Sequence, residues 1–436
     1  MKGKLQWIGV NICRLLVAVA FIFSGITKVI DPHGTEYKLQ DYATALHVEH
    51  LMPSMVALIL SIALAVFEFR IGFCTLFGIY RKATSRIALA FTAVFTLITL
   101  WLAIANPISD CGCFGDAVVL SNWQTFWKNI VLLLAVLVIC RYHKLELRII
   151  SEGRQWIVLI FAQLFALGVA LHALWKLPVV DFRPFRVGNH LPSLMQTSDD
   201  AKFVTTFLME KDGEQRWFSL EDYPDSTWVF VDSKTEQIGE VEKPEIDNFQ
   251  MFLLPEGDDI TEGVLAHRGY VFLLAAPSLR EANDGHMDAY NNIYDYCVAH
   301  DYLFYMLTSS SEEDIKRWMD LTGAEYPICH TDELTLKTMV RSNPGLLLLE
   351  EGTVRAKWPY TDMPELNEES PRIPETGIIE EQEAGNAKRS LRLLLWFIIP
   401  LVVVTFLDRI WWWVTILLNR RRKRRKHILQ DKENVE

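Results

Sequence analysis

The sequence predicts a multi-pass α-helical membrane bundle of six spans combined with an α/β soluble domain. Of the 436 residues, 50% are hydrophobic and 12% are aromatic, which is more apolar than a soluble protein of similar charge usually is. Six apolar runs reach the length of about 20 residues that a membrane helix requires. Residues 177–389, between the fifth and sixth runs, are hydrophilic and alternate between strand and helix patterns, which is typical of α/β domains.

The spans follow one another in the order of the chain, at residues 7–30, 54–80, 84–105, 123–140, 156–175 and 391–418. The first run has no small-residue cleavage site, so we expect an anchor rather than a removed signal peptide. We expect a four-helix membrane domain at residues 1–150 and a fifth span at 151–176. A soluble domain at 177–366 and an acidic linker at 367–389 follow, and the chain closes with a sixth span and a basic tail at 390–436.

Basic residues predict the orientation of the spans. Lysines and arginines gather before the first span, after the second, after the fourth and in the tail block 419–426, and such residues favour the cytoplasmic side. Both termini are then cytoplasmic, and residues 31–53, 106–122 and 177–389 face the periplasm of a bacterial inner membrane. The net charge of −11 argues against a nucleic-acid partner. The lipid bilayer is the expected surrounding.

Ionisable residues inside membrane spans are costly, and they mark functional or structural sites. The first span carries Arg14 and the second carries Glu68. Counted from the cytoplasmic ends at about 1.5 Å per residue, the two reach similar depths. We therefore expect an intramembrane ion pair between Arg14 and Glu68, which either fixes helix register or takes part in chemistry. Lys28 lies near the outer surface, where a snorkelling lysine is ordinary.

The segment NPISDCGCFGDAVVLSN, residues 106–122, places Cys111 and Cys113 on either side of one glycine. Residues flanking a third lie at most about 7 Å apart in an extended chain, and a disulfide needs Cα atoms nearer 5.5 Å, so the backbone must bend. Gly112 permits this bend. The small ring should be strained, which suits a disulfide that is passed on. Acidic neighbours such as Asp110 should raise the pKa of the thiols.

Three interpretations of the cysteine pair stay open. Cys111 and Cys113 are catalytic and redox-active, or they bind a soft metal ion, or they staple the loop. The metal interpretation would recruit histidines from the other outer loop, but their spacing matches no standard motif, so we assign no metal site. These histidines are His33, His47 and His50.

Several motifs of the membrane part occur together. The first span reads Arg14 through FIFSGITKVIDP, the second carries EFRIGF with Glu68 and Gly72, and DCGCFGD follows the third. With these motifs, residues 1–150 resemble the DoxX/MauE family of small four-helix membrane proteins, and the last motif is especially like its MauE branch. The resemblance implies a redox or disulfide-related role at the membrane.

The soluble stretch is predicted to contain alternating strands and helices. The acidic, proline-containing residues 367–389 that follow should bury too little apolar surface to fold. We expect strands at 226–233, 270–278 and 302–310, helices at 287–300 and 311–323, and a hairpin at 345–358 that turns at Glu351 and Gly352.

The end of this domain reads RSNPGLLLLEEGTVRAKW, residues 341–358. It resembles the part of thioredoxin and TlpA-like folds in which a proline opens the penultimate strand, and Pro344 would be the cis-proline of that fold. The resemblance covers about residues 226–366. At the position of the thioredoxin Cys-x-x-Cys this chain reads LLAAPSLREANDG, residues 273–285, without cysteine. We therefore expect a degenerate thioredoxin-like domain that binds rather than exchanges dithiols.

The sequence thus predicts a membrane-bound thiol-disulfide or quinone-linked redox protein that acts through Cys111 and Cys113. Quinone is a candidate electron acceptor, although the sequence offers no binding signature for it, and a periplasmic client or redox partner is expected. The alternative is a non-enzymatic membrane assembly or metal-handling protein whose thioredoxin-like domain binds a client. Cys297 and Cys329 of that domain either pair or stay buried and free.

Overall fold

The computed structural model describes residues 2–108, 110–196, 202–211, 214–219, 228–238 and 244–433. The chain forms two compact units. Unit 1 is helical and comprises Met1–Arg183, Trp358–Met363 and Ile373–Glu436, whereas unit 2 carries the β-sheets and comprises Pro184–Lys357 and Pro364–Arg372.

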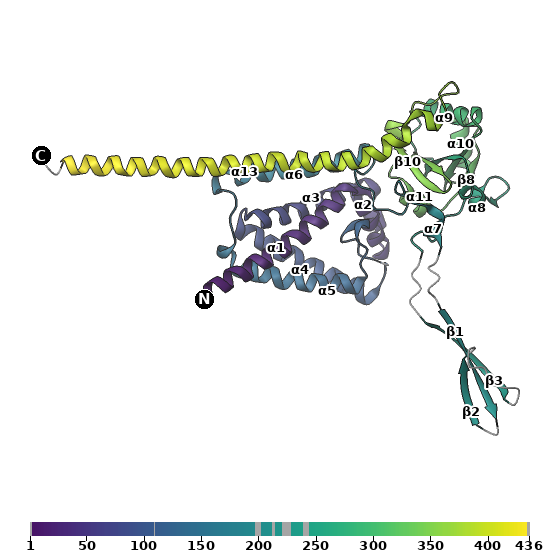
Figure 1. The fold of residues 1–436 in the computed structure, drawn as a ribbon, viewed down its shortest axis with the longest axis horizontal. Coiled ribbons are helices and arrows are strands. Elements are labelled where there is room, and N and C mark those ends of the chain that lie inside the picture. The colour runs from purple at the N-terminus through teal and green to yellow at the C-terminus, as the bar shows by residue number, and fades with distance from the viewer. Residues whose placement is uncertain are drawn as a thin grey trace. The chain divides into compact units, whose positions relative to one another are not determined.

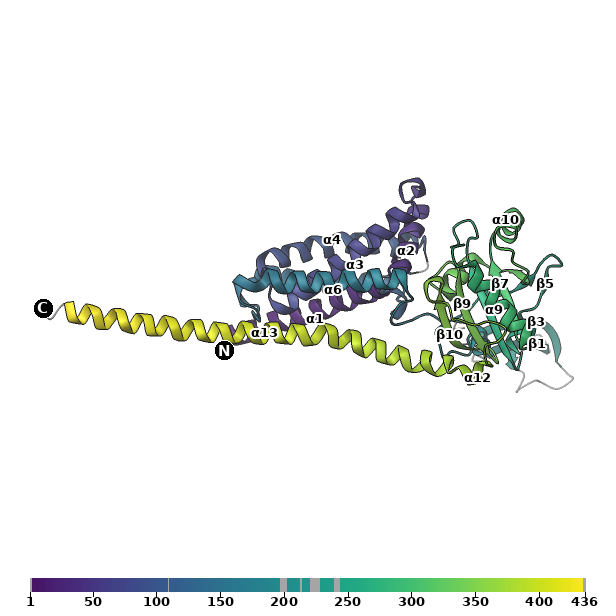
Figure 2. The ribbon, with the colours of Figure 1, turned by 90° about the horizontal axis from the view of Figure 1, so that it is seen from above.

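Unit 1 is a bundle of long apolar helices. Six helices in the described part of the chain are long and apolar enough to cross a membrane, which confirms the predicted spans. Figures 1 and 2 show α1, α3, α4, α5 and α6 lying alongside one another. At one end of the bundle, Asp110 and Cys111 contact α2. The bounds are α1 (Lys2–Ile30), α2 (Pro32–Ala45), α3 (Ser54–Phe77), α4 (Arg81–Ala105), α5 (Asn122–Arg141) and α6 (Gln155–Trp175).

Helices α1 and α3 touch backbone to backbone. A Cβ added at Gly25 would lie 2.5 Å from the backbone nitrogen of Phe69, and one added at Gly72 would lie 2.5 Å from that of Ile22. Only glycine leaves room for such an approach, as in the small-residue contacts of other membrane helices. The contact fixes the axial register of the two helices.

The sixth span belongs to α13 (Ile378–Glu433), which follows the short helix α12 (Ile373–Thr376). A buried carboxylate attaches α13 to the start of α6. Asp408 is 2% exposed, accepts hydrogen bonds from the backbone N–H and the hydroxyl of Ser151, and pairs with Arg154 at 2.8 Å.

The start of α13 corrects the expectation that residues 367–389 do not fold. Residues 378–389 are helical. Glu380 and Glu381 occupy the first turn, where carboxylates interact favourably with the helix dipole. The helix therefore begins well before the apolar residues of the span.

Unit 2 contains a seven-stranded sheet in the order β10-β9-β6-β7-β8-β4-β5. Interior strand β6 (Tyr270–Ala276) is parallel to β7 (Leu303–Thr308) and antiparallel to β9 (Gly345–Glu350), and six of its seven residues are buried. This mixed sheet confirms the predicted α/β class. The other elements are β4 (Phe252–Leu253), β5 (Asp258–Asp259), β8 (Ile328–His330), β10 (Thr353–Pro359), α7 (Leu191–Met195), α8 (Thr261–Leu265), α9 (Met287–Ala299), α10 (Glu312–Thr322) and α11 (Glu333–Met339).

A second sheet in unit 2 has three antiparallel strands in the order β2-β1-β3. Of the strand expected at residues 226–233, residues 229–233 belong to β3, and residues 226 and 227 lie outside the described residues. The described part therefore belongs to this sheet and not to the larger one. The reason is that β1 pairs with β3 along most of its length. The thioredoxin-like strand order is therefore confined to β6, β7, β9 and β10. The three strands are β1 (Lys202–Lys211), β2 (Glu214–Ser219) and β3 (Val229–Ile238).

Candidate functional site

Residues 110–116 form a turn that brings two sulfur atoms together. The Sγ atoms of Cys111 and Cys113 lie 2.9 Å apart, and both residues are free thiols. Gly112 adopts φ +65°, the left-handed conformation that glycine accepts most readily. The N–H of Gly115 donates to the carbonyl of Gly112 at 3.0 Å. The chain therefore bends at Gly112, where the sequence analysis expects it to bend.

Two helix starts fix the segments on either side of the site. Helix α2 follows α1 directly, because Asp31 accepts the N–H of Gly34 as an N-cap and Pro32 occupies the first helical turn. Helix α5 begins with a capping box, in which Ser121 and Gln124 satisfy each other's backbone N–H groups. Both caps position the side chains that surround the turn.

Helix α2 holds the turn in place. Tyr42 donates its hydroxyl hydrogen to the carbonyl of Cys111 at 2.9 Å, and Lys38 forms an ion pair with Asp110 at 2.7 Å. Asp110 also accepts the N–H of Gly112 at 3.0 Å. A Cβ added at Gly112 would lie 3.0 Å from Cγ of Lys38. This position is therefore crowded as well as left-handed.

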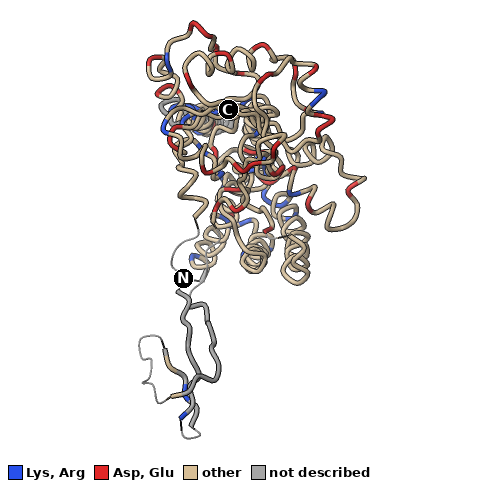
Figure 3. Tube along the Cα trace, turned by 90° about the vertical axis from the view of Figure 1, so that its right-hand side faces the viewer, with Lys and Arg blue, Asp and Glu red and all other residues tan. Residues whose placement is uncertain are grey.

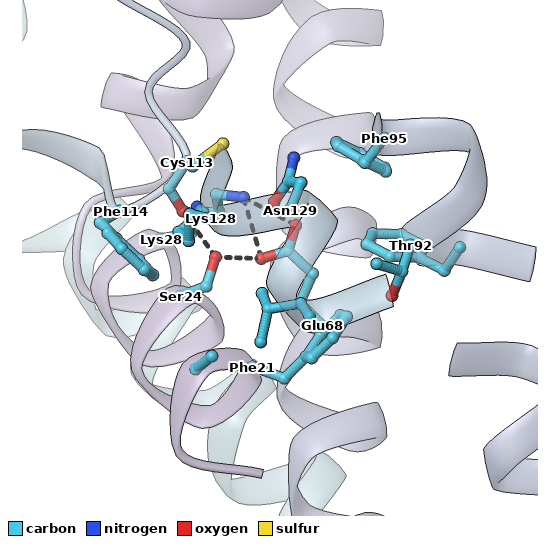
Figure 4. A pocket seen from close by; sticks show the side chains of 13 residues that line it. Phe21, Ser24, Lys28, Glu68, Thr92, Phe95, Cys113, Phe114, Lys128 and Asn129 are labelled. Carbon is cyan, nitrogen blue, oxygen red and sulfur yellow. Dashed lines mark hydrogen bonds and ion pairs between the residues drawn. The ribbon is translucent and has the colours of Figure 1, made fainter. Parts of the chain in front are cut away.

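An intramembrane ion pair lies next to the turn (Figure 4). Nζ of Lys28 lies 2.7 and 2.9 Å from the two carboxylate oxygens of Glu68, and the two side chains are only 5% and 4% exposed. Oγ of Ser24 lies 2.6 Å from Oε2 of Glu68 and 2.6 Å from the carbonyl oxygen of Cys113. A hydroxyl carries one hydrogen, so Ser24 donates to one of these oxygens at a time. Ser24 thus links the carboxylate to the cysteine turn.

The predicted ion pair between Arg14 and Glu68 is wrong, because Glu68 pairs with Lys28. Arg14 instead donates to the carbonyl of Leu147 at 2.5 Å. The glycine contacts between α1 and α3 explain the error, since they set a register in which Arg14 lies level with the end of α3. Few charged residues occur in α1 and α3, so the paired Lys28 and Glu68 are exceptional in their surroundings. Figure 3 marks the Lys, Arg, Asp and Glu residues along the whole described chain.

A cavity of about 40 Å³ adjoins the turn. A water needs about 10–15 Å³, whereas a benzene ring occupies a cavity of about 150 Å³, so the cavity has room for water but not for a quinone ring. Nζ of Lys128 lies 4.1 Å from the centroid of the Phe114 ring, which is a cation–π contact. The polar groups of the cavity wall come from Ser24, Lys28, Glu68, Thr92, Cys113, Lys128 and Asn129.

The two thiols differ in acidity. The pKa of Cys113 is lowered, because this thiol shares a hydrogen bond with Cys111 and because the ammonium groups of Lys128 and Lys28 act on it, although burial opposes ionisation. The pKa of Cys111 is raised, because its ionisation would break the hydrogen bond with Cys113 and because the thiol is buried. Of the two thiols, Cys113 is therefore the one whose ionisation the surroundings favour.

The sequence did not predict that lysine side chains lie close to the two cysteines. It expected Asp110 and Asp116 to raise the pKa of both cysteines, whereas Asp110 is paired with Lys38. It did not consider Lys128 or Ser24 at all. The signal that could have found Lys128 is a lysine inside the fourth apolar span, where charges are costly.

In unit 2, the structure gives the position of the other predicted residues. The Asn343–Pro344 peptide bond is cis, and Pro344 directly precedes β9. The N–H of Asn283 donates to the carbonyl of Asn343 at 3.0 Å, so the cysteine-free loop between β6 and α9 lies against the cis-proline. Cys297 and Cys329 are buried free thiols and are not paired.

The histidines of the outer loop do not join the cysteines. His33 contacts Glu36 at 2.7 Å. Within the described residues, no group of three or more His, Cys, Asp and Glu side chains is placed to hold a metal ion.

The fold and the paired thiols define unit 1 as a multi-pass helical membrane protein with a cysteine turn at one end of the bundle. The family described as methylamine utilisation protein MauE matches residues 6–141. Inner membrane protein YqjF of Escherichia coli (strain K12) is 33% identical over 129 residues, which cover 30% of this chain and 79% of that protein. Through this membrane part the chain belongs to the MauE family.

The remaining comparisons concern the rest of the chain or the fold alone. Residues 203–240, which include β2 and β3, match a family described as a domain of unknown function. A protein of Bacteroides thetaiotaomicron, provisionally described as a protein disulfide isomerase, is 13% identical with a TM-score of 0.23, over 31% of this chain and 85% of that chain. The thioredoxin domain of a thiol-disulfide oxidoreductase from Bacteroides vulgatus is 16% identical with a TM-score of 0.21, over 27% of this chain and 83% of that chain.

Proposed function

We propose that the protein is a membrane-bound thiol-disulfide redox protein whose Cys111 and Cys113 cycle between dithiol and disulfide. The observation that carries the proposal is the 2.9 Å distance between the two sulfur atoms. The proposed location is the bacterial inner membrane, with both termini cytoplasmic and the cysteine turn in the periplasm. Its supports are the distribution of Lys and Arg between the spans and the relative that is named an inner membrane protein.

The proposed reaction oxidises a dithiol of a periplasmic client. The client loses two electrons and two protons and forms its own disulfide, while the bond between Cys111 and Cys113 breaks and the pair is reduced. A membrane acceptor then takes two electrons from the pair and restores the bond. Quinone is the proposed acceptor class, because it becomes quinol by taking up two electrons and two protons.

The cavity beside Cys113 limits how a quinone could react. Since that cavity is too small for a quinone ring, a quinone would approach the sulfur atoms from the exposed side of the turn. A larger apolar cavity of about 500 Å³ lies among α1, α3, α6 and α13, but neither cysteine lines it. Unit 2 has no cysteine in the loop before α9, so we assign it client binding rather than dithiol exchange.

The test follows the oxidation state of the pair in the full-length protein in detergent. The protein is alkylated before and after mild reductant, and the peptide that contains both cysteines is weighed. We expect two adducts after reduction and none after oxidation by a soluble quinone. Cys111→Ser should abolish the reversible change, and the matched control Cys140→Ser should retain it. Equal labelling before and after reductant, or a metal ion bound in proportion to the protein, would refute the proposal.

A further inference from the structure

We propose that Lys28 and Lys128 keep Cys113 as the ionised sulfur of the reduced pair, and that Glu68 is a positioning residue for Lys28. The inference rests on the proposed function and gives the two cysteines unequal roles. Cys111 is the sulfur that keeps its proton.

The charges around the cavity support this assignment. Lys28 and Lys128 bring two positive charges to its wall, and Glu68 brings one negative charge. Lys28 and Glu68 are almost fully buried, so water screens their charges poorly. A thiolate on Cys113 supplies the second negative charge and makes the wall neutral. Oxidation to the disulfide removes that charge and leaves one positive charge in excess.

Groups that face the turn from α2 and from the turn itself do not change this balance. Lys38 and Asp110 form an ion pair and cancel each other. Tyr42 stays un-ionised, because burial raises its pKa. Cys111 stays a thiol for the reasons given above. Asp116 of the same turn does not line the cavity. Among the groups of the cavity wall, the neutralising charge therefore comes from Cys113.

Exposure of the sulfur atoms agrees with the electrostatics. Cys111 is buried, with 8% of its surface exposed, whereas Cys113 is half-buried. A reactive cysteine combines a lowered pKa with access to its reaction partner. Cys113 has the lowered pKa and is the more exposed residue of the two.

The assignment fixes the proton balance of the redox step. Reduction of the disulfide breaks the bond between the sulfur atoms, adds two electrons and binds one proton, which gives a Cys111 thiol and a Cys113 thiolate. One proton per two electrons lowers the potential by about 30 mV per pH unit. Below the lowered pKa of Cys113 the thiolate is protonated as well, so two protons are bound and the slope becomes about 60 mV per pH unit.

The first measurement is the alkylation rate of Cys113 against pH in full-length Cys111→Ser protein, read from the mass of the Cys113 peptide. It needs no disulfide, so it succeeds or fails independently of the proposed function. The ionised fraction of a thiol falls about tenfold for each pH unit by which its pKa exceeds the pH. We therefore expect Lys128→Met to slow alkylation at pH 7, by about tenfold for each unit by which the raised pKa then exceeds the pH.

Two control variants separate charge from folding. Lys128→Arg keeps the positive charge and should retain the rate of the unsubstituted lysine. Lys82→Met removes a lysine at the start of α4, at the opposite end of the bundle, and should have no effect. The double variant Lys28→Met/Glu68→Leu should slow alkylation less than Lys128→Met, because the two removed charges act on Cys113 in opposite directions.

The second measurement is the potential of the Cys111–Cys113 pair against pH. Lys128→Met should move the change of slope to higher pH, because the thiolate is then less stable. An alkylation profile that is identical with and without the Lys128 charge overturns the proposal. A potential that keeps the two-proton slope of about 60 mV per pH unit well above neutrality overturns it too.

Discussion

Replacement of Glu68 by glutamine should destabilise the bundle by about 3–5 kcal/mol, because it leaves the Lys28 charge buried without its partner. The structure supports this magnitude. The carboxylate accepts two bonds from Lys28 at 2.7 and 2.9 Å, and each hydrogen bond to a charged group contributes about 1.5–3 kcal/mol. Lys28→Met combined with Glu68→Leu should lose less than about 1 kcal/mol, because apolar pairs replace buried ion pairs at little cost.

The assay is unfolding in mixed micelles with increasing sodium dodecyl sulfate, followed by tryptophan fluorescence. The matched control is the exposed ion pair of Lys176 and Asp362, whose side chains are 40% and 63% exposed, and Lys176→Met should cost less than about 1 kcal/mol. The reasoning fails if Glu68→Gln costs no more than Lys176→Met. It also fails if the double variant is as unstable as Glu68→Gln.

Three further variants test other contacts. Gly72→Ala puts a Cβ 2.5 Å from the backbone of α1 and should cost about 1–3 kcal/mol in the same unfolding assay. Gly168→Ala, where an added Cβ meets nothing within 4 Å, should be neutral or stabilising, and equal losses would contradict this account. Gly112→Ala forces a side chain onto φ +65° at a cost of about 1–2 kcal/mol, and reoxidation of the cysteine pair should slow measurably. Asp408→Ala removes charged bonds of about 1.5–3 kcal/mol each, so proteolysis should release α13 faster, and an unchanged cleavage rate would refute its anchoring role.

Local patterns predict the parts of the fold that depend on local physics. A membrane helix satisfies its own backbone hydrogen bonds, so length and hydropathy identify each span without knowledge of its neighbours. The buried strands β6 and β9 are found in the same way. Pairing is not local, and residues 226–233 show this limit. Their pattern predicts a strand, but only the structure shows that β1 pairs with it and keeps it out of the larger sheet.

In the candidate site, too, some features can be predicted from the local sequence and others cannot. The Cys-Gly-Cys turn can be predicted, because Gly112 lies between the two residues it has to bring together. Its basic surroundings cannot, because contact with Lys28 depends on the register of α1 against α3, and contact with Lys128 depends on the rotation of α5. A comparison of residue depths in the membrane takes neither the helix register nor the helix rotation into account, so it predicts an ion pair between Glu68 and Arg14.

The backbone contact at Gly25 and Gly72 has a consequence for the protein in lipid. Two helices that meet without side chains between them cannot slide past each other by small steps, so α1 and α3 move as one rigid body. A thicker or thinner bilayer is then accommodated by tilting the bundle. The spacing between the ion pair and the sulfur atoms stays constant. Transfer between membranes of different thickness should therefore leave the acidity of the thiols unchanged.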